Sequence, residues 1–83
     1  MGTKKLERVL KLLAELLNAE SPRTAEELRS KIKMYPDDIV AFRRAFNRDK
    51  SALKDMGVPL QMISVGESHK NVEAYFVDNQ DYY

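Results

Sequence analysis

DDIVAFRRAFNRDKSALKDMG, residues 37–57, has the pattern of one long amphipathic helix. Its apolar residues recur at intervals of four, seven and three, so they fall on one stripe of a helix with 3.6 residues per turn. They are Phe42, Phe46, Leu53 and Met56. The opposite side carries basic, amide and hydroxyl side chains, namely Arg43, Arg44, Asn47, Arg48, Lys50, Ser51 and Lys54. This helix therefore suits a protein core on one side and an anionic partner on the other.

The composition is that of one small soluble domain. The chain has 83 residues, of which 43% are hydrophobic and 33% charged, which favours a globular fold over a disordered tail. The absence of cysteine excludes disulfides and thiolate metal sites. No apolar run approaches the roughly 18 residues that a membrane span requires, and the first apolar segment is too charged for a signal peptide. We expect a cytoplasmic, nucleoid-associated protein with no membrane partner.

The small net charge conceals an asymmetry along the chain. Thirteen of the 14 Lys and Arg residues lie within residues 1–56, whereas four of the 13 acidic residues lie within residues 57–83. The first part therefore carries a net charge of +4 and the second part −3. A basic part followed by an acidic tail is compatible with binding to nucleic acid.

Residues 3–19 are expected to form the first helix, with Thr3 as its N-cap. A broad apolar stripe runs along it, made of Leu6, Val9, Leu10, Leu13, Leu16 and Leu17. Such a stripe predicts the floor of the core. A dimer contact for part of the stripe is the alternative.

A second, shorter helix is predicted after a loop at residues 18–23. Thr24 and Glu27 have the spacing of a capping box, and the apolar residues that follow favour a helix ending near Lys33. Residues 34–37 form a turn, because Pro36 disfavours helix in the residue before it, and Asp37 or Asp38 can cap the long helix. Gly57 is suited to end that helix in a left-handed conformation. Two helices joined by a short turn, the second rich in arginine, predict a helix-turn-helix.

Two strands are predicted after Gly57. Residues 58–65 and 72–77 have the composition of strands, with Pro59 at an edge or a strand start, and residues 66–71 form a polar loop between them. A hairpin of this kind after a helix-turn-helix is the wing of a winged helix. We therefore predict an α+β fold, a winged helix-turn-helix with three helices followed by a two-stranded β-hairpin wing, in one domain over residues 1–83.

The sequence resembles the N-terminal winged-helix domain of the WYL-domain transcriptional regulators, of the actinobacterial proteasome accessory factor B/C type. The resemblance rests on KKLERVLKLLAELL (4–17), TAEELR (24–29), YPDD (35–38), AFRRAFNRDKSALKDMGVPL (41–60) and AYFVDNQDYY (74–83). It implies a DNA-binding domain followed, in the whole protein, by a WYL domain that binds any effector. Many relatives carry a basic residue where this chain has Phe76, and an exposed aromatic there argues against a phosphate contact.

The polar side of residues 37–57 is the predicted DNA contact. Arginine can pair with guanine and asparagine with adenine through two hydrogen bonds, which suits Arg43, Arg44, Asn47 and Arg48 for base or groove contacts. Lys50, Ser51 and Lys54 are better candidates for phosphate contacts. At the tip of the hairpin, His69 and Lys70 are predicted to contact phosphate or the minor groove. The alternative is that they are ordinary loop residues. A solvated charged surface is the alternative for the whole set.

Asp49 interrupts the apolar stripe between Phe46 and Leu53. A carboxylate at such a position needs a partner, because burying an unpaired charge is costly. We predict a structural role for Asp49, either orienting Arg48 or pairing with a basic residue elsewhere.

Little in the sequence favours catalysis, and we predict neither an enzyme nor a cofactor. The single histidine, His69, has no nucleophilic residue at a spacing typical of a catalytic site. The two pairs of consecutive acidic residues, Glu26-Glu27 and Asp37-Asp38, are explained by helix capping. The function predicted is sequence-specific binding of double-stranded DNA in a bacterial transcription regulator, by two such domains on paired half-sites through dimerisation or internal duplication. The alternative is a winged helix that serves protein–protein contact or dimerisation, through the long helix or Phe76.

Overall fold

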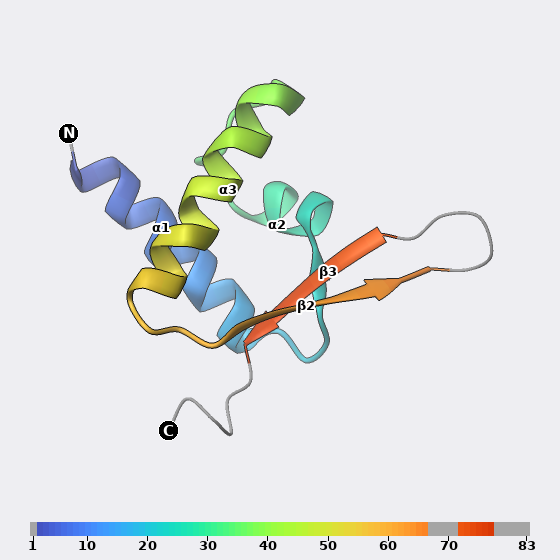
Figure 1. The fold of residues 1–83 in the computed structure, drawn as a ribbon. Coiled ribbons are helices and arrows are strands. Elements are labelled where there is room, and N and C mark those ends of the chain that lie inside the picture. Colours follow the sequence, from blue (N-terminus) through green and yellow to red (C-terminus); the bar gives the residue numbers. More distant parts are fainter. Residues whose placement is uncertain (1, 67–71, 78–83) are drawn as a thin grey trace.

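A computed structural model of the chain describes residues 2–66 and 72–77 (Figure 1). It contains three helices, α1 (Gly2–Asn18), α2 (Ala25–Lys31) and α3 (Ile39–Asp55). It also contains three strands, β1 (Arg23–Thr24), β2 (Leu60–Val65) and β3 (Val72–Val77). This is an α+β fold compatible with a winged helix, which confirms the predicted fold class.

The sheet is antiparallel, with the strand order β1-β3-β2. The predicted hairpin is β2 and β3, which pair from Leu60 with Val77 to Val65 with Val72. Strand β1 was not predicted, because its two residues were placed in a loop and at a helix cap. It pairs Arg23 with Tyr75 and Thr24 with Ala74, so the sheet has three strands rather than two. A strand this short has no periodicity that a sequence pattern could show.

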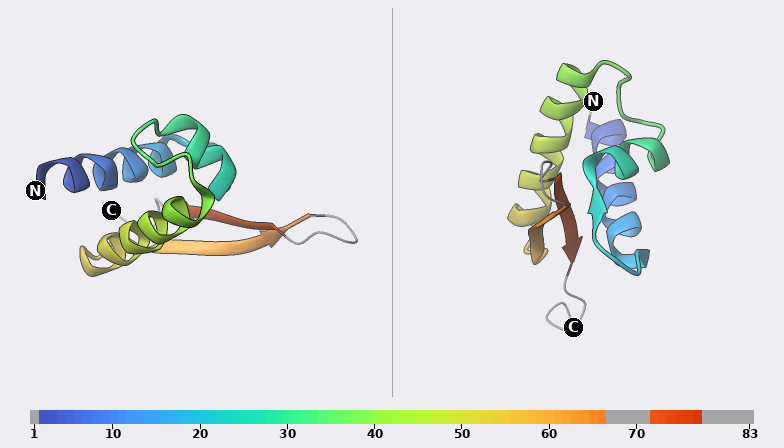
Figure 2. Two further views of the ribbon diagram at one scale, coloured as in Figure 1. Left: turned by 90° about the horizontal axis from the view of Figure 1, so that it is seen from above. Right: turned by 90° about the vertical axis from the view of Figure 1, so that its right-hand side faces the viewer.

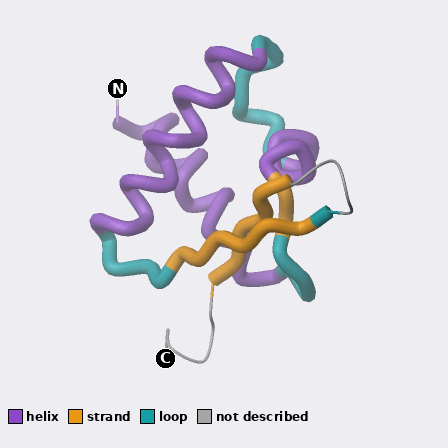
Figure 3. The backbone as a smooth tube through the Cα atoms, turned by 45° about the vertical axis from the view of Figure 1, so that its right-hand side comes forward, coloured by secondary structure: helices purple, strands orange, loops and turns teal. Residues whose placement is uncertain are grey.

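The hairpin projects beyond the helices when the molecule is seen from above (Figure 2), and the strands lie side by side (Figure 3). Of the polar loop predicted at its tip, residues 66–71, all but Gly66 fall outside the described residues, and so do the contacts predicted for His69 and Lys70.

Both ends of α3 are capped as the sequence predicts. The Asp38 carboxylate accepts a hydrogen bond of 2.9 Å from the Ala41 amide at the start of the helix. At the other end Gly57 has a φ of 87°, and the Val58 amide donates to the Leu53 carbonyl over 3.0 Å. This pattern turns the chain sharply towards β2. Met56 lies in that turn and is 53% exposed, so its predicted place on the buried stripe is wrong.

Helix α1 supplies the floor of the core, as predicted, but the buried stripe is narrower and is centred on Leu12, which was not among the six residues predicted for it. Leu12 lies at its centre, fully buried with Val9 and Leu16. Leu6 and Leu10 were expected on this stripe but are exposed, because they lie at its margin. The helix begins at Gly2, so Thr3 lies within its first turn and is not the N-cap.

The predicted capping box begins α2. The Thr24 hydroxyl accepts from the Glu27 amide over 3.2 Å, and the Glu27 carboxylate accepts from the Thr24 amide over 2.9 Å. The hydrogen bond from the Thr24 amide lowers the pKa of Glu27 below its usual value. Because Thr24 also pairs with β3, the start of α2 is fixed to the sheet.

The connection between α2 and α3 is longer than the short turn predicted. Helix α2 ends at Lys31 rather than near Lys33, which leaves residues 32–38 between the helices. Tyr35 lies in this connection and is buried in the core. The Arg29 guanidinium of α2 donates a hydrogen bond to the Asp37 carbonyl and lies 5.5 Å from the centre of the Phe42 ring of α3. Arg29 thus fixes the end of the connection to both helices.

Four aromatic rings form a continuous chain through the core. Phe42 and Phe46 stack with their ring centroids 5.4 Å apart. Tyr35 and Phe42 form an edge-to-face pair with ring centroids 5.1 Å apart. Phe46 in turn meets the Tyr75 ring of β3 at 5.2 Å, nearly perpendicular. Pairs of this geometry contribute about 0.5–1.5 kcal/mol beyond the area they bury. The chain of rings links the helical connection, α3 and the hairpin.

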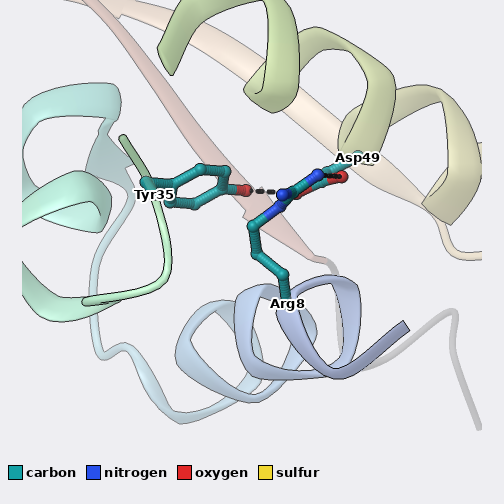
Figure 4. A network of polar contacts seen from close by, with 3 residues as sticks. All are labelled: Arg8, Tyr35 and Asp49. Atoms are coloured by element: carbon teal, nitrogen blue, oxygen red, sulfur yellow. Dashed lines mark hydrogen bonds and ion pairs between the residues drawn. The ribbon is translucent and has the colours of Figure 1, made fainter. Parts of the chain in front are cut away.

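Asp49 is fully buried and accepts three hydrogen bonds (Figure 4). The Arg8 guanidinium donates two, over 2.7 and 2.9 Å, and the Tyr35 hydroxyl donates the third over 2.7 Å. These bonds raise the pKa of Arg8, while burial raises the pKa of Tyr35. The prediction that Asp49 pairs with a basic residue elsewhere is confirmed. The alternative partner, Arg48, is wrong, because Arg48 lies on the exposed side of α3.

We expect Asp49→Asn to lower the free energy of unfolding by roughly 3 kcal/mol, because it leaves the Arg8 guanidinium largely buried without its counter-charge. The matched control is Asp55→Asn, an exposed carboxylate of the same helix, which should change stability by no more than about 0.5 kcal/mol. Urea unfolding followed by circular dichroism measures both. Equal effects of the two substitutions would contradict a structural role for Asp49.

Candidate nucleic-acid interface

The exposed side of α3 carries nearly all of the predicted DNA contacts. Its orientation is fixed by the opposite side, where Phe42, Phe46, Asp49 and Leu53 are buried. Six predicted contact residues lie exposed on the outer side: Arg43, Arg44, Asn47, Arg48, Ser51 and Lys54. The seventh, Lys50, is half-buried. The amphipathic pattern of the sequence therefore predicted correctly which side of the helix faces outwards.

The cations on this surface have no acidic partner within residues 2–66 and 72–77. The ion pairs found there are Arg8–Asp49, Arg23–Glu27 and Arg29–Glu26. None involves Arg43, Arg44, Arg48 or Lys54. Asp55, at the end of α3, lies beside Arg48 and Ser51 on this surface. The surface thus holds a concentration of positive charge available to an external anion.

A groove of about 650 Å³ separates α3 from the hairpin. Figure 1 shows α3 and β2 diverging from residues 56–59, which connect them. Ile39, Arg43 and Asn47 line the groove from α3, and Phe42, Phe46 and Tyr75 are among its apolar residues. Glu26 and Glu73 also line it. Because two carboxylates face this space, phosphate groups are better accommodated on the outer side of α3 than inside the groove.

Lys50 connects α3 to the hairpin. Its ammonium nitrogen donates to the Tyr75 hydroxyl over 3.2 Å, and that hydroxyl donates to the Glu73 carboxylate over 3.4 Å. The same nitrogen lies 4.8 Å from the centre of the Phe46 ring and 4.6 Å from that of Tyr75. Burial lowers the pKa of Lys50, and the neighbouring Glu73 opposes this shift. Lys50 therefore differs from the other cations of α3, because its ammonium is already bound within the protein.

Three residues that position α3 and the hairpin, namely Arg8, Tyr75 and Glu73, were not identified from the sequence. Arg8 lies in a helix that the pattern assigned only to the core floor, and its partner is 41 residues away. Tyr75 was overlooked in favour of Phe76, which was expected to be exposed and is half-buried. Tyr75 and Val77 share one side of β3 and both are buried, but Ala74 on the other side is buried too, so alternation along the strand was only a partial signal. Glu73 lies on the same side as Tyr75 and accepts a hydrogen bond from the Tyr75 hydroxyl, and its charge acts on Lys50.

Within the described part of the chain, no group of three or more His, Asp or Glu side chains has the arrangement of a metal site. No helix there is long and apolar enough to cross a membrane.

The chain is similar to mycobacterial proteins named PafB. Those of Mycobacterium leprae (strain TN) and Mycobacterium tuberculosis (strain ATCC 25618 / H37Rv) are each 39% identical to it over 84 aligned positions, which cover 99% of this chain. The PafB of Mycobacterium bovis (strain ATCC BAA-935 / AF2122/97) matches to the same extent. The chain spans about a quarter of the length of these curated relatives, since the match covers 25% of each. No protein-family model matches the chain.

We expect Lys50→Ala to loosen the hairpin and to lower the free energy of unfolding by about 1–2 kcal/mol, through loss of two cation–ring contacts and one hydrogen bond. Lys54→Ala, four residues further along the same helix and exposed, is the matched control, with an expected change within about 0.5 kcal/mol. Urea unfolding gives the stabilities. Amide hydrogen exchange should show faster exchange in β2 and β3 for Lys50→Ala alone, and unchanged exchange there would contradict the connecting role.

Proposed function

We propose that this chain is the DNA-binding part of a bacterial transcription regulator of the WYL-domain type, and that α3 enters the major groove of double-stranded DNA. Its similarity to PafB proteins over nearly its whole length supports a regulator of the proteasome accessory factor B/C type, as do the motifs of residues 41–60. An α+β fold compatible with a winged helix supports DNA binding, since such folds present one helix on an open surface.

The observation that carries the proposal is the outer side of α3. Four cations there have no ion-pair partner among the described residues, and an asparagine and a serine lie among them. On a helix without an anionic partner, clustered like charges repel one another. The phosphates and base edges of a DNA groove supply both counter-charge and hydrogen-bond acceptors to such a surface.

The residues on this surface have different roles in the proposal. Arg43, Arg44, Asn47 and Arg48 contact base edges or the groove, because their side chains can form paired hydrogen bonds with guanine or adenine. Ser51 and Lys54 lie closer to the end of the helix and contact phosphate. Lys50 contributes less to phosphate binding than Ser51 and Lys54, because its ammonium already bonds to the Tyr75 hydroxyl. His69 and Lys70 remain predicted contacts of the hairpin tip.

The function of the whole protein is a further part of the proposal. Two such domains would bind paired half-sites, through dimerisation or through a duplicated domain in one chain. An effector would bind the part of the protein that lies outside this chain. Such a regulator would act in the cytoplasm, in association with the nucleoid.

The alternative function, a winged helix that binds another protein, has less support. It relied on the long helix or on an exposed Phe76 as the docking site, and the Phe76 ring is half-buried in β3. A protein interface also favours an apolar centre with few charges. The outer side of α3 has the opposite character, so DNA is the better partner.

The direct test is a titration of the isotope-labelled chain with a mixed-sequence DNA duplex, followed by amide chemical shifts at low and then raised salt. We expect shifts concentrated at residues 43–51 and in the hairpin, which diminish as salt rises because phosphate contacts release counterions. Shifts spread evenly over every basic surface would indicate nonspecific attraction, and an absence of shifts at low salt would refute DNA binding by this chain.

Substitutions separate base contacts from phosphate contacts. Lys54→Gln should weaken binding equally for all sequences and reduce the slope of log affinity against log salt by about one unit. Arg44→Gln should instead lower the preference for a selected sequence, by about 1–3 kcal/mol. Lys11→Gln, an exposed cation of α1, is the control and should change neither quantity. Fluorescence anisotropy over a range of salt concentrations measures both effects.

A further inference from the structure

The first turn of α3 presents two aliphatic side chains to solvent. Ile39 is 44% exposed and Val40 55% exposed, and they are the first two residues of the helix. Neither burial nor helix propensity accounts for them, because β-branched residues are weaker helix formers than the charged residues common on surfaces. Exposed apolar side chains that adjoin one another on a functional surface often mark a contact with a partner.

Their positions place them in line with the polar residues of the interface. Ile39 precedes Arg43 by four residues and Asn47 by eight, and all three line the groove beside the hairpin. Val40 precedes Arg44 by the same four residues. Residues four apart lie on one side of a helix. Each aliphatic side chain therefore begins a row of hydrogen-bonding side chains at the N-terminal end of α3, the end that lies closest to base edges in helix-turn-helix complexes.

The electrostatics at this end of α3 disfavour phosphate. Asp37 and Asp38 directly precede the two aliphatic residues, and the Asp38 carboxylate caps the helix. Arginines follow one turn later and attract the duplex as a whole. An apolar pair between carboxylates and guanidinium groups fits an uncharged, apolar part of DNA. On the major-groove edges of the bases the C5-methyl group of thymine has this character.

We propose that Ile39 and Val40 contact thymine methyl groups in the major groove, and so determine a preference for thymine beside the bases contacted by Arg43 and Arg44. The inference rests on the proposed function and adds to it the identity of a base. Each methyl group removed from water by such a contact raises affinity about fourfold.

The test uses a duplex selected for binding to the chain from a random-sequence pool at about 50 mM salt, where phosphate attraction is strong. Each thymine of the selected site is replaced in turn by deoxyuridine, which lacks only the methyl group. We expect affinity to fall about fourfold at one or two positions. Ile39→Ala and Val40→Ala should cause a similar loss with the thymine duplex. They should also remove the difference between thymine and deoxyuridine at the position that each residue contacts.

Leu10→Ala is the matched control, since Leu10 is an exposed aliphatic residue of α1, the helix that packs on the buried side of α3. It should leave both the affinity and the deoxyuridine effect unchanged. Amide spectra of each variant establish that the fold is retained. If deoxyuridine causes no loss, or the same loss in the Ile39 and Val40 variants as in the parent chain, the methyl contact is refuted while DNA binding stands. Failure to select any duplex overturns both.

Discussion

The carboxylate of Asp49 joins three parts of the chain that are distant in sequence. It binds the Arg8 guanidinium from α1 and the Tyr35 hydroxyl from the connection between α2 and α3. Every buried side-chain polar atom among the described residues has a hydrogen-bond partner, which is the condition under which buried charge is tolerated. Because Asp49 lies at the centre of the buried side of α3, the network fixes the rotation of the helix about its axis. That rotation determines which side chains face outwards.

The hairpin takes its position from the same helix. The aromatic chain passes from Phe46 to Tyr75, and Lys50 lies over both rings. The hairpin and α3 are therefore joined by packing and by a hydrogen bond, in addition to the short connection between them. A domain built in this way presents the two elements to a partner as one surface. In the proposed complex with DNA, this arrangement determines the distance between the groove that α3 enters and the backbone beside the hairpin.

Elements with a strong period could be predicted from the sequence, and contacts between elements could not. The period of residues 37–57 was enough to identify the outer side of α3. Thr24 was enough to place the start of α2, and Asp38 and Gly57 the two ends of α3. Arg8 looked like any charged residue on an amphipathic helix, because nothing local indicates a partner 41 residues away. Tyr35 was assigned to a turn, since a proline follows it, and its burial depends on the long connection folding back over α3. The contact residues themselves remain predictions.

Thr24 belongs to the sheet and to a helix cap at the same time, and it pairs with a residue 50 positions further along the chain. The start of α2 is therefore held to the sheet only once β3 has docked. Together with the Arg8–Asp49 pair, this gives a largely helical chain contacts of high sequence separation. Contacts of that kind slow folding, because a long loop must close before they form. We therefore expect this domain to fold more slowly than its helix content alone would indicate.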